Sequence, residues 1–300
     1  MVGEEYIFKL TDGSSLRGIK WSNPEAKARI VIITGMEEYA MRYDNFAQYL
    51  ASEGYEAYCL DHFGQGSNAC DRRLLGVWPI DAFEKTVDNQ AALIEHIKGD
   101  LPLYLFGHSL GSFISQRVIQ KYSHLVDKVI LCGSNGPDPM IKIGYLLSTI
   151  IVSHRGYYKK SKLFNDMVFG AYAKTVKDAN TDFDWLSYNE KNVQKYIDDP
   201  FCGYGSTGGF YREFLKGLSK LFNKNRLKNI RHDLPILIIS GAEDPVGKNG
   251  QGVSELKDIY SKLGIENVQL IVYQKMRHEI LNEIDNMQVY QNILHFLQTN

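Results

Sequence analysis

The sequence predicts an α/β fold in which a mostly parallel central sheet is covered by helices on both faces and interrupted by a mainly helical insertion. Short apolar runs alternate with helical patterns of 10 to 20 residues, which is the order of βαβ units in a parallel sheet. This alternation stops after residues 132–139 and resumes at 234–241. The chain has 300 residues, 44% of them hydrophobic, and is long enough to bury one large core.

The predicted elements begin with a β-hairpin, because two strand-like runs, residues 5–10 and 15–21, flank turn residues at 11–14. The hydrophobic period then changes, and short apolar runs alternate with amphipathic stretches. In chain order these are a strand at 29–34, a helix at 44–54, a strand at 55–60, a helix at 79–98, a strand at 101–106, a helix at 112–122 and a strand at 128–133.

The helix predicted at 79–98 has the clearest pattern. Pro79 suits the first turn of a helix, where a missing N–H costs nothing. The apolar positions are spaced by threes, fours and one double turn, which predicts a single buried stripe. This stripe consists of Ile80, Phe83, Val87, Ile94 and Ile97.

A helical insertion is predicted at residues 135–232, which are rich in aromatic residues, glycine and lysine and contain no convincing strand. We therefore expect a core formed by residues 1–134 and 233–300. The core resumes with a strand at 234–240, a helix at 253–263, a strand at 267–273 and a helix at 280–298.

Charge and glycine spacing argue against binding of nucleic acids and nucleotides. The chain has 34 basic and 35 acidic residues and a formal net charge of −1, so no general attraction to nucleic acid is expected. The glycines within residues 61–67 invite a nucleotide-binding interpretation. This segment lacks the G-x-G-x-x-G spacing and the helix start of a pyrophosphate site, so we interpret it as a structural turn.

The cysteines and the N-terminus predict a soluble, cytoplasmic protein. The cysteines show no C-x-x-C spacing and indicate neither a disulfide framework nor a zinc site. The N-terminus lacks the charged-then-apolar plan of a secretory signal, and no stretch approaches the ~18 apolar residues of a membrane span. The cysteines are Cys59, Cys70, Cys132 and Cys202.

Ser109 lies in a glycine-rich turn between a predicted strand and a predicted helix. A turn this tight leaves no room for side chains two positions on either side of the serine, and Gly107 and Gly111 occupy those positions. The arrangement is typical of a nucleophile elbow, which exposes the hydroxyl at the carboxyl end of the sheet and beside a helix N-terminus. The alternative is an ordinary turn with a capping serine.

A serine nucleophile needs a histidine that accepts its proton. Of the eight histidines, only His278 follows a late predicted strand and precedes a predicted helix. His295 falls within the terminal helix, and His232 precedes a strand. His108 is too close to Ser109 along the chain to fold back as its base. We therefore predict His278 as the general base.

An acidic side chain that orients the histidine is expected on another loop at the same edge of the sheet. Asp244 lies just past a predicted strand, and Glu243 is its only near rival. Taken alone, an Asp-Pro loop is more often a turn, and a loop histidine is equally unspecific. The order serine, acid, histidine is that of α/β-hydrolases, so the three together predict a triad of Ser109, Asp244 and His278.

An oxyanion hole needs two backbone N–H donors, one after the nucleophile and one after an early strand. Leu110 supplies the first donor. The second is expected from Met36, because Gly35 lets the backbone approach closely. Taken alone, these two residues would be interpreted as a simple turn.

Together these residues resemble the monoacylglycerol lipase and lysophospholipase group of α/β-hydrolases over almost the whole chain. The chain departs from the group at Thr34, where a histidine usually precedes the glycine of the oxyanion loop. Glu38, Arg42 and Tyr43 match the group's pattern, and the resemblance implies that they support this loop. The matching segments are residues 34–55, 60–68, 106–112, 198–218, 241–253 and 276–283.

The resemblance implies a serine esterase or lipase that hydrolyses single-chain acyl esters, such as monoacylglycerols or lysophospholipids, through an acyl-enzyme intermediate. It also implies that the insertion is a cap over the active site, and that neither a cofactor nor a metal is needed. Two alternatives stay open, namely a peptidase or thioesterase on the same fold and a lipid-binding protein without catalytic activity.

Basic residues surround an apolar segment of the insertion, residues 145–152, and give residues 140–170 a net charge of +4. Such a surface could dock on an anionic membrane, line an acyl tunnel with a phosphate site at its mouth, or pack on the core with a solvated charged face. Tyr204 and Phe210 are expected to line a tunnel, and residues 206–211 to give the cap flexibility. The charged residues are Lys142, Arg155, Lys159, Lys160, Lys162 and Asp166.

Overall fold

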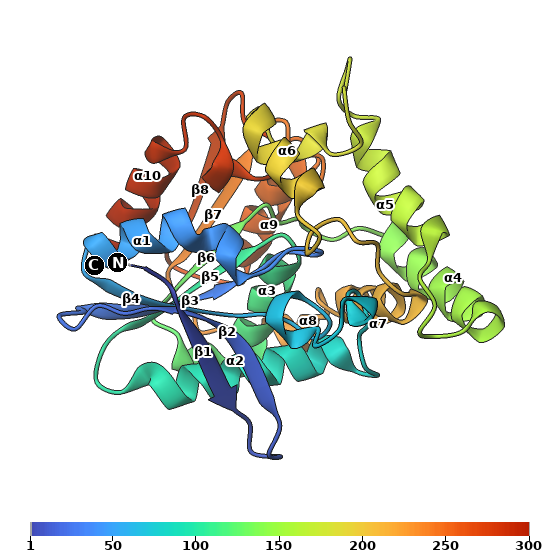
Figure 1. Cartoon of the computed structure of the whole chain (residues 1–300). Helices are drawn as coiled ribbons and strands as arrows, with labels where there is room; N and C mark the ends of the chain where they lie inside the picture. The colour runs from blue at the N-terminus through green and yellow to red at the C-terminus, as the bar shows by residue number, and fades with distance from the viewer. Residues whose placement is uncertain (1, 300) are drawn as a thin grey trace.

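A mixed β-sheet forms the centre of the computed structural model, which describes residues 2–299 (Figure 1). The strands are β1 (Glu4–Lys9), β2 (Ser15–Trp21), β3 (Ala28–Ile33), β4 (Tyr55–Leu60), β5 (Leu103–His108), β6 (Lys128–Cys132), β7 (Ile236–Gly241) and β8 (Val268–Tyr273). Within the described residues their order is β1-β2-β4-β3-β5-β6-β7-β8. β1 and β2 form the predicted hairpin, and β2 runs antiparallel to β4. All pairs from β4 to β8 are parallel.

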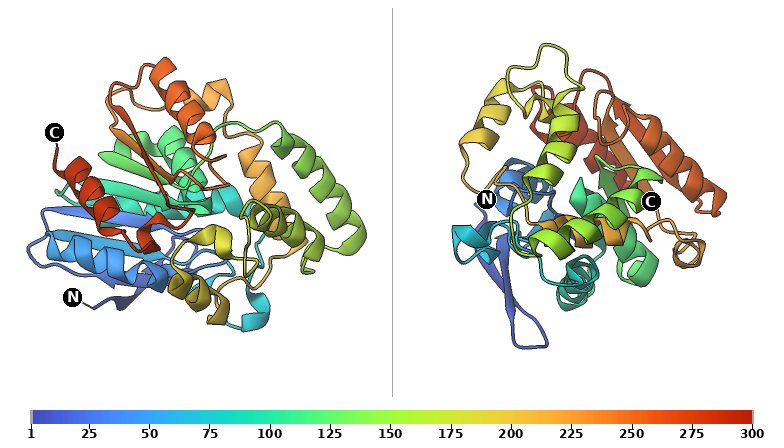
Figure 2. Two further views of the ribbon diagram at one scale, coloured as in Figure 1. Left: turned by 90° about the horizontal axis from the view of Figure 1, so that it is seen from above. Right: turned by 90° about the vertical axis from the view of Figure 1, so that its right-hand side faces the viewer.

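Helices cover both faces of the sheet, as the sequence predicted (Figures 1 and 2). Strands β4 to β7 are buried at every position, which is expected of parallel strands covered on both sides. One face packs against α1 (Asp44–Ser52) and α10 (Met287–Gln298), and the other against α2 (Ala82–Lys98), α3 (Leu110–Tyr122) and α9 (Gln251–Lys262).

The prediction for the start of α2 was wrong by one turn. Asp81 has a φ of 60°, a left-handed conformation that interrupts a right-handed helix, so α2 begins at Ala82. Pro79 therefore lies before the helix, and Ile80 is 56% exposed instead of belonging to the buried stripe. The other four residues of the predicted stripe are buried: Phe83, Val87, Ile94 and Ile97.

The C-terminal helix also begins later than predicted. Ile280–Asn282 forms a separate 3-10 turn, and α10 begins at Met287. Between them the Glu283 carboxylate accepts hydrogen bonds from the backbone N–H groups of Arg277 and Tyr188. Through its side chain, Glu283 thus ties this loop to residues outside the helix.

The insertion between β6 and β7 is helical (Figure 2). Every residue from 135 to 232 is described, and none belongs to a strand of the sheet. Helix α7 packs between α4 and α2, and α8 contacts α3. The helices are α4 (Met140–Arg155), α5 (Lys162–Ala173), α6 (Glu190–Asp198), α7 (Gly208–Leu218) and α8 (Lys224–Leu227).

Part of the apolar surface of α4 and α5 is exposed to solvent. In residues 145–152, Ile151 packs against the core, whereas Leu146 and Ile150 are exposed. Among residues 2–299, no helix combines the length and the apolar character that crossing a membrane requires. Contact of this surface with a membrane stays a prediction. The exposed residues on or beside the two helices are Met140, Ile143, Leu146, Leu147, Ile150, Tyr158, Leu163 and Met167.

Candidate active site

Ser109 occupies a sharp turn between β5 and α3, with a φ of 52° and a ψ of −119°. The two neighbouring glycines are required by close backbone contacts. A Cβ atom on Gly107 would lie 2.4 Å from the carbonyl oxygen of Gly111, and one on Gly111 would lie 2.0 Å from the carbonyl oxygen of Ile33. No side chain fits at these distances. The turn therefore has the local geometry of a nucleophile elbow.

His278 and Asp244 are in direct contact. The Nδ1–H of His278 donates a hydrogen bond of 2.9 Å to Oδ1 of Asp244, and both side chains are buried. Asp244 is held in place because it also accepts a hydrogen bond of 2.9 Å from the backbone N–H of Val246. Its rival Glu243 is exposed and accepts a hydrogen bond from Tyr188 instead. This pairing leaves Nε2 of the histidine free to exchange a proton with another group.

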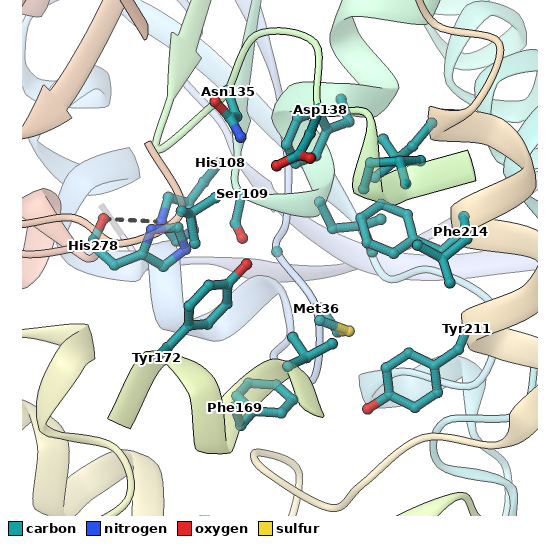
Figure 3. A pocket seen from close by; sticks show the side chains of 18 of the residues that line it. Met36, His108, Ser109, Asn135, Asp138, Phe169, Tyr172, Tyr211, Phe214 and His278 are labelled. Atoms are coloured by element: carbon teal, nitrogen blue, oxygen red, sulfur yellow. Dashed lines mark hydrogen bonds between the residues drawn. The ribbon is translucent and has the colours of Figure 1, made fainter. Parts of the chain in front are cut away.

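Ser109 and His278 line one cavity of about 620 Å³ (Figure 3). Their side chains point toward the same part of it, although no hydrogen bond joins them in the described part of the chain. His108 packs against His278 with ring centroids 4.7 Å apart, and its Nε2–H faces the His278 carbonyl oxygen at 3.3 Å. Within residues 2–299, no group of three His, Cys, Asp or Glu side chains is placed to hold a metal ion.

The two expected oxyanion donors lie at the same cavity. Leu110 is the first residue of α3, so its backbone N–H has no partner within the helix. Met36 follows the end of β3, and its N–H donates no hydrogen bond to any described residue. A Cβ atom on Gly35 would lie 2.5 Å from the Glu38 carboxylate, so any other residue there would displace this side chain.

The carboxylate of Glu38 fixes the loop that carries Met36. It accepts hydrogen bonds from the backbone N–H of Gly35 and, at 2.6 Å, from the hydroxyl of Tyr43. Burial alone would raise its pKa, but the hydrogen bond from His108 and the charges of His108 and Arg42 lower the pKa of Glu38 to about 2. The carboxylate therefore stays ionised. These contacts are those expected of supports for the loop.

The cavity wall differs from the sequence expectation. Phe210 packs against Trp78 with ring centroids 4.4 Å apart, and the Tyr204 hydroxyl donates to the Gly64 carbonyl at 3.4 Å. Neither Tyr204 nor Phe210 lines the cavity, so this prediction was wrong. Successive helical residues are rotated by about 100°, so Phe210 and the next residue face different surroundings. The residues of α7 that line the cavity are Tyr211, Phe214, Leu215 and Leu218.

Several cavity residues were missed by the sequence prediction. Trp185 packs on His278 with ring centroids 5.1 Å apart, and Tyr172 packs on Trp185 at 4.9 Å. On α5 the lining residues are spaced by one, three and four positions, so an amphipathic pattern was present in the sequence. Those residues are Phe164, Val168, Phe169 and Tyr172.

His62 contacts the backbone of the same loop, and we expect it to make stability dependent on pH. Its side chain is buried, and Nε2–H donates a hydrogen bond of 3.1 Å to the Thr34 carbonyl, whereas Nδ1 has no partner among the described residues. Burial lowers the pKa of His62 to about 4. As the pH falls, the His62 imidazole therefore takes up a proton in the unfolded chain before it does so in the folded protein. We expect folding stability to be lost between about pH 6.5 and pH 4 for this reason.

When the pH falls from 7 to 4, we expect the free energy of unfolding of the wild-type protein to fall by about 3 kcal/mol more than that of His62→Gln. The measurement is urea unfolding at several pH values. The comparison with His62→Gln is needed because burial raises the pKa of Asp61 to about 6, which has the opposite effect on stability in this range. Parallel stability curves for the two proteins would contradict the prediction.

Several known proteins are similar to this chain. The family model described as serine aminopeptidase, S33, matches residues 24–285. A monoacylglycerol lipase of Mycolicibacterium smegmatis is 23% identical over 264 residues, 88% of this chain and 85% of the relative. A probable lysophospholipase of Haemophilus influenzae is 23% identical over 297 residues, 91% of this chain and 85% of the relative.

Two solved structures illustrate the shared fold. A thermostable carboxyl esterase of Bacillus coagulans, in complex with glycerol, has a TM-score of 0.90 at 22% identity. The match covers 99% of this chain and 98% of the esterase chain. A soluble variant of the Saccharomyces cerevisiae monoglyceride lipase, in complex with a substrate analogue, has a TM-score of 0.76 at 19% identity. The match covers 99% of this chain and 96% of the lipase chain. The α/β-hydrolase fold predicted from the sequence is confirmed by these likenesses.

Proposed function

The chain belongs to the serine aminopeptidase, S33, family of α/β-hydrolases, and from this premise we propose that it is a serine esterase acting on single-chain acyl esters. Ser109 attacks the ester carbonyl, and His278 takes the proton from the serine and returns it to the leaving alcohol. Asp244 orients the imidazole and stabilises its charged form. The N–H groups of Met36 and Leu110 bind the oxyanion. Water then hydrolyses the acyl-enzyme.

The observation that carries this proposal is the apolar cavity that has Ser109 on its wall. Its volume of about 620 Å³ lies within the range of cavities that enclose small organic ligands. An acyl chain has only apolar surface to bury, which matches walls made of aliphatic and aromatic side chains. Apolar residues beyond the triad include Phe113, Ile141, Phe164, Val168, Phe214, Leu215, Leu218 and Phe222.

The insertion supplies most of this wall, and we propose that residues 135–232 act as a cap that defines the acyl site. The similarity to a monoacylglycerol lipase and to a probable lysophospholipase supports a lipid ester as substrate. The family description favours a second candidate, an aminopeptidase. The triad would serve both reactions, because esters and amides share the tetrahedral oxyanion.

A substrate panel separates these candidates. Purified wild-type protein is incubated with monoacylglycerols, lysophospholipids, acyl-CoA and aminoacyl amides, and the products are identified by mass spectrometry. We expect free fatty acid from at least one of the single-chain esters. Release of amino acids without fatty acid would replace the esterase proposal with a peptidase.

The acyl site is tested by two substitutions on one helix. Ile141 on α4 lines the cavity, whereas Ile143 is 57% exposed. Tryptophan at Ile141 is expected to fill part of the cavity and to lower kcat/KM for p-nitrophenyl decanoate about tenfold, with less than about a threefold change for the acetate ester. The matched control, Ile143→Trp, leaves both values unchanged. Equal losses for the two esters would contradict acyl binding at this wall.

A further inference from the structure

Glu37 follows the expected oxyanion donor Met36 and adopts a conformation that is unfavourable for its residue type. Its φ is 58°, in the left-handed region that glycine adopts without strain. Its side chain is buried, with 1% of the residue surface exposed. A non-glycine residue stays in this region only when its surroundings hold it there. The contacts of Glu37 therefore need an explanation.

Glu37 accepts four hydrogen bonds from one segment of the insertion. Its carboxylate accepts from the Ser206 hydroxyl at 2.7 Å and from the Gly205 N–H at 3.0 Å. Its backbone carbonyl accepts from the Tyr196 hydroxyl at 3.1 Å and from the Gly203 N–H at 3.2 Å. One residue of the loop after β3 thus holds residues 196–206, which are more than 150 positions away along the chain.

The carboxylate of Glu37 is not neutralised by direct contact with a cation. Among the described residues it forms no salt bridge, and the nearby Lys160 ammonium donates instead to the carbonyls of Leu75 and Gly205. Burial raises the pKa of Glu37, while the bonds from Ser206 and Gly205 oppose this shift. A buried carboxylate without an ion partner is costly, so an apolar residue would suit mere packing better.

We propose that Glu37 is a positioning residue that couples the seating of the insertion to the oxyanion hole. When residues 203–206 lie against Glu37, its backbone is fixed, and with it the backbone of the adjacent Met36, whose N–H keeps its direction at the cavity. The ester carbonyl is then polarised only when the cap is in place over the acyl chain. This inference rests on the proposed esterase function, because it assigns Met36 to the oxyanion hole.

The main test is Glu37→Gly, which removes the carboxylate and also relieves the left-handed strain, so that it does not unfold the loop through strain. We expect kcat for p-nitrophenyl butyrate and the rate of Ser109 phosphonylation by a fluorophosphonate to fall about 10- to 100-fold, because one oxyanion donor is displaced. KM changes less than about threefold, since the acyl wall is left in place. The melting temperature stays close to that of wild type.

Asp178→Gly is the matched control. Asp178 has a φ of 57° in an exposed loop of the insertion, so the substitution relieves the same kind of strain away from Met36. Its kcat and phosphonylation rate are expected to equal those of wild type. A purely structural role of Glu37 would lower the melting temperature and the active fraction but leave kcat per labelled site unchanged, which would overturn the proposal.

The contact between Glu37 and Ser206 is tested by a double-mutant cycle on kcat. Ser206→Ala is expected to lower kcat about threefold in the wild-type background and to have no further effect in Glu37→Gly, because the two residues act through one contact. Additive losses would overturn the coupling. If wild-type protein labels with the fluorophosphonate and Ser109→Ala does not, a normal rate in Glu37→Gly refutes only the role of Glu37. Absence of labelling in wild type refutes the esterase proposal and this inference together.

Discussion

Replacing Ser109 with alanine is expected to lower kcat for p-nitrophenyl butyrate about 10⁵-fold, on the scale of triad knockouts in other serine hydrolases. The methyl group cannot form the acyl-enzyme, so only the oxyanion donors and the cavity remain to accelerate the reaction. Initial rates measure the loss, and mass spectrometry of the protein after fluorophosphonate treatment measures whether residue 109 carries the label.

The same experiment includes two further variants. Ser254→Ala removes an exposed hydroxyl that donates only to the Gly250 carbonyl at 2.9 Å, and it should leave kcat unchanged. His278→Ala should lower kcat about as much as Ser109→Ala does. The double variant should lower kcat no further than either single variant, because the two groups act in one step. Activity of Ser109→Ala within about tenfold of wild type would remove Ser109 from the mechanism.

The arrangement of the three residues proposed as a triad follows from features that the sequence contains. Ser109 follows β5, Asp244 follows β7 and His278 comes after β8. Parallel strands end at the same edge of a sheet, so residues just past their carboxyl ends converge whatever their separation in the chain. The contact between Asp244 and His278, which spans 34 positions, could therefore be predicted without knowledge of the packing.

The residues of the cavity wall and the contacts of Glu37 depend on how the helices and loops pack together. Phe210 and Tyr211 are adjacent aromatic residues on α7, and only the packing of this helix decides which of them faces the cavity. In the sequence, nothing distinguishes Glu37 from other acidic loop residues. The partners of its carboxylate lie in a segment of the insertion that has no regular hydrophobic period. Hydrophobic periodicity predicts elements, whereas polar contacts between distant loops depend on how those elements are placed.

The hydrogen-bonded network around the proposed triad leads to the largest expected change in stability. Arg42 lies between two buried carboxylates, with Nη2 2.6 Å from Glu279 and Nε 3.4 Å from Glu38. It thereby joins the loop of Met36 to the residue that follows His278. Both carboxylate side chains are at most 5% exposed, so water cannot replace the guanidinium. Removing this cation leaves the buried Glu279 carboxylate without an ion partner among the described residues, whereas Glu38 keeps its contact with His108 at 3.3 Å.

We therefore expect Arg42→Met to lower the free energy of unfolding by about 3–5 kcal/mol, measured by urea denaturation at pH 7. Arg117→Met is the control, since Arg117 pairs with Glu84 at 3.1 Å and the Glu84 side chain is 35% exposed. Loss of this partly exposed pair should lower the free energy of unfolding by no more than about 1 kcal/mol, because Glu84 is reached by water and keeps Arg226 as a partner at 3.0 Å. Adding Glu279→Gln to Arg42→Met should recover part of the loss, as it removes the carboxylate that is left without an ion partner. Similar losses in the two arginine variants would show that the interior pair is not the source of the effect.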